Sequence, residues 1–101
     1  MSPFTIRHTV AFRLKHAPGS EAERDFLDAA ERLLAPIPGV QAFECLRQVS
    51  RKNNFTFALS MEFGDQAAYD GYNNHPDHVR FVQGRWIPEV EEFLEIDYVR
   101  Y

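Results

Sequence analysis

A strict alternation of large apolar with small or polar side chains runs through Phe55-Thr56-Phe57-Ala58-Leu59-Ser60-Met61-Glu62-Phe63. Successive side chains of a β-strand point to opposite faces of its sheet, so the large apolar residues would share one face. The same alternation runs from Phe4 to Leu14, with His8 among the apolar positions. These two stretches predict two strands of a sheet with one apolar face.

A helix is predicted between these two strands. Ser20 and Glu23 have the spacing of a capping box, in which Ser20 covers free amides at the helix start and Glu23 reaches back to the Ser20 amide. Apolar side chains then recur at helical spacing, with charged side chains between them. Pro36 and the pair Pro38-Gly39 are expected to end this helix.

Two shorter helices are predicted in the second half of the chain. Asp65 is expected to cap a helix that reaches about Tyr72. Proline is favoured at the first helical position, so a further helix is expected to begin at Pro76 and to fade between residues 84 and 88.

Further strands are predicted over residues 40–49 and 93–101, with a hairpin turn at residues 51–54. The order is strand, helix, strand, strand, helices, strand, which is a split βαβ unit repeated twice. Right-handed crossovers turn this order into a ferredoxin-like α+β fold: a four-stranded antiparallel sheet with helices on one face. Residues 1–101 are expected to form one domain.

The second face of the predicted sheet carries threonine, alanine and serine with scattered charges. These side chains are too small and neutral for an ordinary solvated surface. A face of this kind is often covered by a second copy of itself, which predicts a homodimer that pairs through the sheet. A solvated open face is the alternative.

Composition excludes several classes of partner. The net charge is −4, so a basic stripe for nucleic acid is not expected. The apolar runs are too short to cross a membrane, and residues 1–15 lack the layout of a signal peptide. Because Cys45 is the sole cysteine, no internal disulfide can form. These features predict a cytoplasmic protein.

Titratable chemistry gathers in residues 72–81, which hold Tyr72 and His78 on either side of Pro76. With Pro76 at the first helical position, His78 falls in the first helical turn, where free amides and the helix dipole disfavour a positive charge. A neutral imidazole can accept a proton. If a break at Asn73-Asn74 turns both side chains into one cavity, Tyr72 could stabilise an enolate oxygen while His78 acts as base. Asp77 would oppose this effect if its carboxylate faced the ring.

Structural roles for the histidines remain open beside the catalytic one. His75 can cap the helix that begins at Pro76, and His78 can be a core histidine bonded to a backbone carbonyl. His8 is expected to be buried and to need a partner, either a backbone group or a pocket ligand. A metal held by His75, Asp77, His78 and His8 is a weaker option because no second cluster of ligands supports it.

The remaining candidates have structural interpretations. Cys45 has no neighbouring histidine and is expected to be inert. The acidic run Glu89, Glu91, Glu92 and Glu95 is expected to be solvated. Phe81 and Trp86 are expected to be core rings. A ligand pocket is expected to be lined by His8, Phe57, Phe81 and Trp86. Neither a metal nor another cofactor is expected.

Four segments together resemble the stress-responsive dimeric α/β barrel (Dabb) family, in register over nearly the whole chain. They are His8-Thr9-Val10-Ala11-Phe12-Arg13-Leu14, Ile37-Pro38-Gly39-Val40, His75-Pro76-Asp77-His78 and Ile96-Asp97-Tyr98. The resemblance implies a ferredoxin-like monomer whose sheet pairs with a second copy to form a barrel.

The family includes a plant olivetolic acid cyclase, which closes a polyketide without a cofactor, and stress-induced proteins that assemble into rings. The resemblance implies a catalytic pair at Tyr72 and His78 and a pocket position at His8. The chain departs from the cyclase at Phe57, where the cyclase has a pocket histidine, and at Asn73-Asn74 and Arg80. Three functions stay open: a cofactor-free cyclase or lyase, a binder of a small apolar or aromatic metabolite, and a structural stress-related oligomer.

Overall fold

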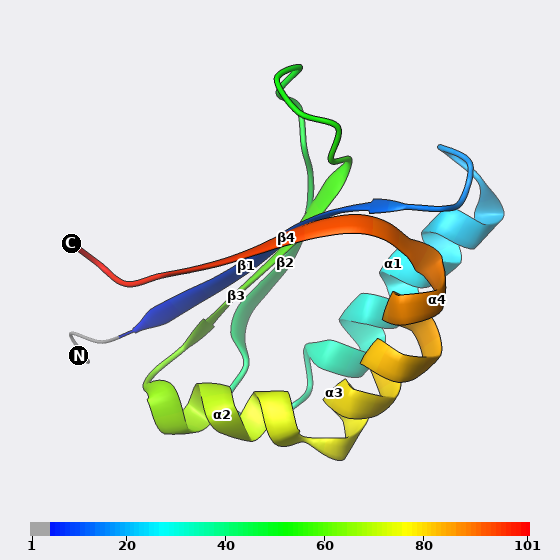
Figure 1. Cartoon of the computed structure of the whole chain (residues 1–101). Helices are drawn as coiled ribbons and strands as arrows, with labels where there is room; N and C mark the ends of the chain where they lie inside the picture. Colours follow the sequence, from blue (N-terminus) through cyan, green and yellow to red (C-terminus); the bar gives the residue numbers. More distant parts are fainter. Residues whose placement is uncertain (1–4) are drawn as a thin grey trace.

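The computed structural model describes residues 5–101, so the predicted strand residue Phe4 lies outside the described part. Figure 1 shows the arrangement of the elements. In chain order they are β1 (Ile6–Leu14), α1 (Glu21–Leu34), β2 (Gln41–Arg47), β3 (Phe57–Phe63), α2 (Gln66–Asn74), α3 (Pro76–Phe81), the π-helical segment η1 (Val82–Trp86), α4 (Ile87–Glu89) and β4 (Val90–Tyr98).

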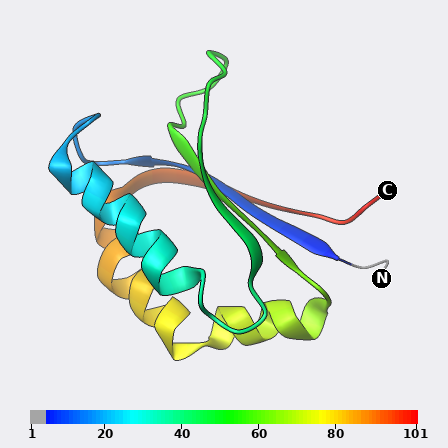
Figure 2. The same cartoon turned by 180° about the vertical axis from the view of Figure 1, so that it is seen from behind.

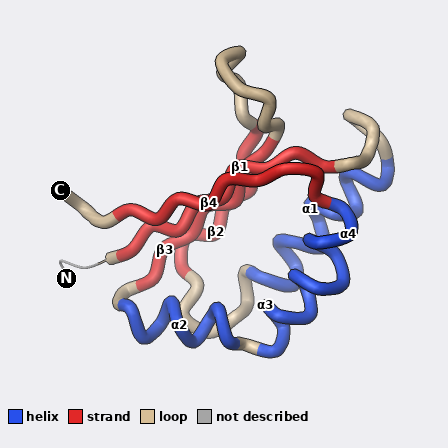
Figure 3. Tube along the Cα trace, viewed as in Figure 1, coloured by secondary structure: helices blue, strands red, loops and turns tan. Residues whose placement is uncertain are grey.

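The strands form one sheet in the order β2-β3-β1-β4, and every neighbouring pair is antiparallel. The helices cover one face of this sheet, and the opposite face carries none of them (Figures 1 and 3). Seen from behind, α1 and the run from α3 to α4 lie side by side beneath the sheet (Figure 2). The predicted ferredoxin-like α+β fold is confirmed.

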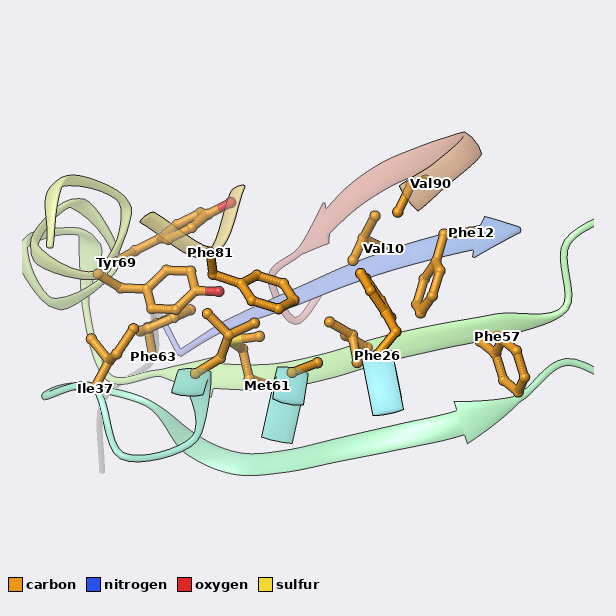
Figure 4. Packing of buried hydrophobic residues seen from close by; sticks show 14 of the residues in the cluster. Val10, Phe12, Phe26, Ile37, Phe57, Met61, Phe63, Tyr69, Phe81 and Val90 are labelled. Carbon is orange, nitrogen blue, oxygen red and sulfur yellow. The ribbon is translucent and has the colours of Figure 1, made fainter. Parts of the chain in front are cut away.

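Alternation along β1 and β3 places their apolar side chains under the helices. Phe12 is fully buried, and its ring contacts those of Phe26, Phe57 and Trp86 at centroid distances of 6.0, 5.9 and 5.0 Å. Val10 and Phe12 from β1 and Met61 from β3 point into the layer between sheet and helices (Figure 4). The size of the rings in this aromatic layer determines the distance between the helices and the sheet.

The start of α1 confirms the predicted N-cap at Ser20, whose side chain accepts a hydrogen bond from the Glu23 amide at 3.2 Å. The predicted donor of the second capping-box hydrogen bond, the Ser20 amide, is wrong. Glu23 accepts from the Gly19 amide at 3.0 Å, because the Ser20 amide already donates to the Ala17 carbonyl.

The two helices before the final strand also begin where the sequence predicts. Asp65 caps α2, which runs on to Asn74 rather than ending near Tyr72. His75 is the N-cap of α3, and its Nδ1 accepts from the Asp77 amide at 3.1 Å. The predicted fading over residues 84–88 is wrong, because η1 and α4 continue the helical path to Glu89.

The last strand begins at Val90 rather than at the predicted residue 93, and it ends at Tyr98. Its outward side chains Leu94, Ile96 and Tyr98 stand opposite the β1 residues Ala11, Thr9 and Arg7. They are 49%, 38% and 51% exposed. The helix-free face of the sheet is therefore more apolar than an ordinary solvated face.

Glu89, the last residue of α4, bonds both to the loop after β1 and to η1. Its carboxylate accepts from His16 Nε2 at 2.7 Å and from Arg85 Nε at 2.5 Å. Arg85 also donates to Asp25 on α1. Partial burial works against ionisation of Glu89, but the hydrogen bonds from Arg85 and His16 hold the pKa of its carboxyl below the ordinary value. The prediction that Glu89 belongs to a solvated acidic run is wrong.

Replacing Glu89 by glutamine is expected to lower the free energy of unfolding at pH 7 by about 1.5–3 kcal/mol, the typical scale for hydrogen bonds to a charged group. Because the pKa of Glu89 is depressed in the folded state, this stabilisation is present above the unfolded pKa and is lost as pH falls through the folded pKa. Urea unfolding of both proteins at pH 7 and pH 3 measures it. The exposed Glu91→Gln is the matched control. A pH-independent difference would contradict the prediction.

Candidate functional site

A cavity of about 130 Å³ lies between the sheet and the helices. Its walls are mostly apolar, and its polar groups come from two histidines, one tyrosine and one glutamate. The lining residues are His8, Val10, Leu34, Leu59, Met61, Tyr72, His78, Phe81, Val82, Trp86, Phe93 and Glu95. An apolar chamber with a few converging polar groups suits a small organic ligand.

Tyr72 and His78 meet at this cavity, with ring centroids 4.4 Å apart. The helix break that brings them together lies at His75, an extended residue between α2 and α3, rather than at the predicted Asn73-Asn74, which belong to α2. His78 Nδ1 lies 3.0 Å from the Asn73 carbonyl oxygen. A carbonyl only accepts, so Nδ1 carries the proton and neutral His78 keeps its lone pair on Nε2. The predicted bond of His78 to a backbone carbonyl is therefore present, and it uses Nδ1 only.

Burial lowers the pKa of His78, although its hydrogen bond to the Asn73 carbonyl acts in the opposite direction. Burial also raises the pKa of the Tyr72 hydroxyl, as does the charge of Glu95. At neutral pH the pair is therefore a neutral imidazole beside a protonated phenol. Asp77 does not face the His78 ring: it pairs with Arg80 at 3.0 Å and lies 3.8 Å from His75.

His8 is 4% exposed, as its place among apolar residues predicts, but its partners are the side chains of Asp97 and Tyr69 rather than the predicted backbone group or ligand. Nδ1 lies 2.6 Å from Asp97 Oδ1 and 3.0 Å from the Tyr69 hydroxyl oxygen. The Tyr69 hydroxyl donates to Asp97 Oδ2 at 2.7 Å. Antiparallel register places His8 directly opposite Asp97, while Tyr69 reaches both from α2.

Phe81 and Trp86 line the cavity, as the sequence predicts, but Phe57 does not. Phe57 is the first residue of β3, opposite Phe12, where its ring packs in the core and the Arg47 guanidinium lies over it, 5.2 Å from the ring centroid. Its inward direction follows from strand alternation, but its position along the strand takes it past the cavity. Phe57 is therefore a core residue rather than part of this pocket.

Sequence reasoning missed Asp97, Tyr69 and Glu95 as parts of the site. Glu95 lies on the inward face of β4, two residues before Asp97, and its Oε2 is 3.9 Å from His8 Nε2. The alternation of Glu95 and Asp97 in β4 is visible in the sequence. Their contact with His8 depends on the pairing of β1 with β4, in which Asp97 lies opposite a residue 89 positions earlier in the chain.

Within residues 5–101, no group of three or more histidine, cysteine or acidic side chains is arranged to hold a metal ion. His8 is instead hydrogen-bonded through Nδ1 to Asp97 and Tyr69, which also bond to each other. The described helices also include none that is long and apolar enough to cross a membrane.

Three solved structures show how the chain relates to known proteins. A Dabb family protein with a ferredoxin-like fold from Mesorhizobium loti is 59% identical, with a TM-score of 0.96 over 97% of this chain and 98% of that chain. A hydroxynitrile lyase from Passiflora edulis is 18% identical, with a TM-score of 0.84 over 98% of this chain and 95% of that one.

A dimeric ferredoxin-like protein of unknown function from Thermobifida fusca is 19% identical, with a TM-score of 0.79 over 96% of this chain and 92% of that chain. No curated protein sequence matches the chain significantly. Residues 6–100 match the family model described as the stress responsive A/B barrel domain. The chain therefore belongs to the stress-responsive A/B barrel domain (Dabb) family.

Proposed function

We propose that the chain acts as a single Dabb-type domain that binds a small apolar or aromatic metabolite in the cavity between sheet and helices. We further propose that Tyr72 and His78 act on this ligand as a cofactor-independent cyclase or lyase. The observation that carries the proposal is the neutral His78 in ring contact with Tyr72 at the wall of an apolar cavity.

The Tyr72 hydroxyl supports a role as hydrogen-bond donor to the ligand. Tyr72 is 2% exposed and lines the cavity, and within residues 5–101 its hydroxyl makes no hydrogen bond. The hydroxyl lies at the cavity wall and has a proton to donate, so a ligand oxygen in the cavity would give it a partner. The apolar walls would hold the remainder of the ligand.

The proposed chemistry uses proton transfer alone. In a cyclase reaction, His78 Nε2 takes a proton from the carbon next to a carbonyl, and the electron pair moves onto the carbonyl oxygen, where Tyr72 donates a hydrogen bond. In a lyase reaction on a hydroxynitrile, the base takes the hydroxyl proton, the carbonyl forms, and the bond to the nitrile carbon breaks to release cyanide. The hydroxynitrile lyase of the same fold motivates a cyanohydrin as probe.

The assembly that we propose is a homodimer through the helix-free face of the sheet. Leu94, Ile96 and Tyr98 are exposed there, and the relative from Thermobifida fusca is described as dimeric. A second copy that covers this face would remove apolar surface from water and would leave the helix-side cavity in each protomer.

The test is an assay of the purified protein with mandelonitrile, an aromatic cyanohydrin, in which benzaldehyde is followed by its absorbance. Benzaldehyde release faster than in buffer, without added metal or cofactor, is the expected result. If the protein neither turns over nor binds mandelonitrile and assembles into large rings, the structural alternative is favoured. Binding without turnover would favour a metabolite-binding protein.

A further inference from the structure

We infer that Asp97 and Tyr69 are positioning residues that present His8 Nε2 to the cavity as a second proton-accepting group, opposite His78. This inference deepens the proposed function by adding a second acceptor for the polar part of the ligand. It stands on the hydrogen bonds around His8 and on the position of His8 in the cavity wall.

The bonds at Nδ1 determine which nitrogen of His8 carries a proton. The Asp97 carboxylate only accepts, so at 2.6 Å it takes the proton of Nδ1. The Tyr69 hydroxyl donates its proton to Asp97 Oδ2. Its oxygen can therefore only accept a hydrogen bond from His8 Nδ1. Both partners therefore require a proton on Nδ1, and neutral His8 keeps its free lone pair on Nε2.

Nε2 is the nitrogen on the cavity side. Its charged neighbour at 3.9 Å is Glu95, which lines the cavity, whereas Asp97 and Tyr69 do not line it. With its side chain 5% exposed, His8 reaches ligand from the cavity rather than from open solvent. An aspartate that fixes the tautomer of a histidine in this way maintains the base in its working form.

The Tyr69 hydroxyl determines how the side-chain amide is oriented in an Asp97→Asn variant. Tyr69 donates to one side-chain oxygen of residue 97, so the asparagine oxygen is drawn to that side. The amide NH₂ then faces His8 Nδ1 and requires it to accept a hydrogen bond. The proton of neutral His8 moves to Nε2, and the cavity faces a donor instead of an acceptor.

Adding Tyr69→Phe to Asp97→Asn releases this constraint. Without the hydroxyl, the amide can turn its oxygen to Nδ1 and restore the proton there. The double variant is therefore expected to regain the wild-type tautomer that the single Asp97→Asn variant loses. A merely structural role for Asp97 predicts no such reversal, because two lost bonds would disturb the packing more than one.

Side-chain ¹⁵N NMR of the ligand-free protein tests the inference. We expect neutral His8 with Nδ1 protonated in the wild type, Nε2 protonated in Asp97→Asn, and Nδ1 protonated again in the double variant. Asp70→Asn, an exposed position next to Tyr69, is the matched control and leaves the wild-type pattern unchanged.

A wild-type His8 with its proton on Nε2 would overturn the inference, even if neither variant folds. An Asp97→Asn protein with an unchanged tautomer would also overturn it. Because no ligand is present, this outcome is independent of whether mandelonitrile is turned over, and the failure of one proposal leaves the other intact.

Discussion

Turnover of mandelonitrile is expected to fall about 10²–10⁴-fold when His78 is replaced by asparagine, the usual range for loss of a general base. Asparagine retains hydrogen-bonding groups but cannot accept a proton at neutral pH. The wild-type rate should depend on the neutral form of His78. Because burial lowers the pKa of this histidine, the rate should hold its plateau below the ordinary histidine pKa of 6.5 and decline only at lower pH.

The matched control for this variant is the same substitution three residues earlier. His75 caps α3 from outside the cavity, and asparagine is a favourable N-cap residue, so His75→Asn should retain both fold and rate. Rates and circular dichroism of the wild type and both variants give the comparison. A folded His78→Asn protein with the wild-type rate would exclude His78 as the base.

Replacing Phe12 by alanine is expected to lower the free energy of unfolding by about 3–5 kcal/mol, the range for removing a fully buried phenylalanine. Phe12 is 0% exposed and packs between the β3 ring Phe57, the α1 ring Phe26 and Trp86. Since Trp86 also lines the cavity, loss of Phe12 should loosen the cavity wall as well as the core.

Urea unfolding monitored by Trp86 fluorescence measures this change. Val79→Ala, on the 40% exposed side chain of α3, is the control and should change the free energy of unfolding by no more than about 0.5 kcal/mol. A Phe12→Ala protein within about 1 kcal/mol of the wild type would show that the aromatic layer does not hold sheet and helices together.

Local sequence signals were sufficient to predict the fold. Alternation in residues 55–63 determines which face of β3 is buried, Ser20 and Asp65 mark helix starts, and Pro76 begins α3 as proline favours. Errors arose where local rules compete. Over residues 84–88, glycine and proline favour an end, but the partly buried Trp86 packs against Phe12 and the chain stays helical through η1 and α4.

The candidate site could be predicted in part. Tyr72 and His78 are close in sequence, so a single break between two helices brings them together. Asp97 meets His8 through the β1–β4 register, and Tyr69 joins them from α2, so neither contact has a local signal. For Phe57, strand alternation predicts the inward direction of the side chain. Its position outside the cavity follows only from the β1–β3 register, which places it opposite Phe12.

The most direct test of the proposed cavity function uses the four histidines of the chain as reporters. Acetophenone, a small aromatic ketone, is titrated into the protein while the side-chain ¹⁵N resonances are recorded. Binding in the cavity predicts saturable shifts of His8 and His78, with His16 and His75 unchanged because they lie outside it. The absence of shifts, or equal shifts of all four histidines, would contradict a ligand site at this cavity.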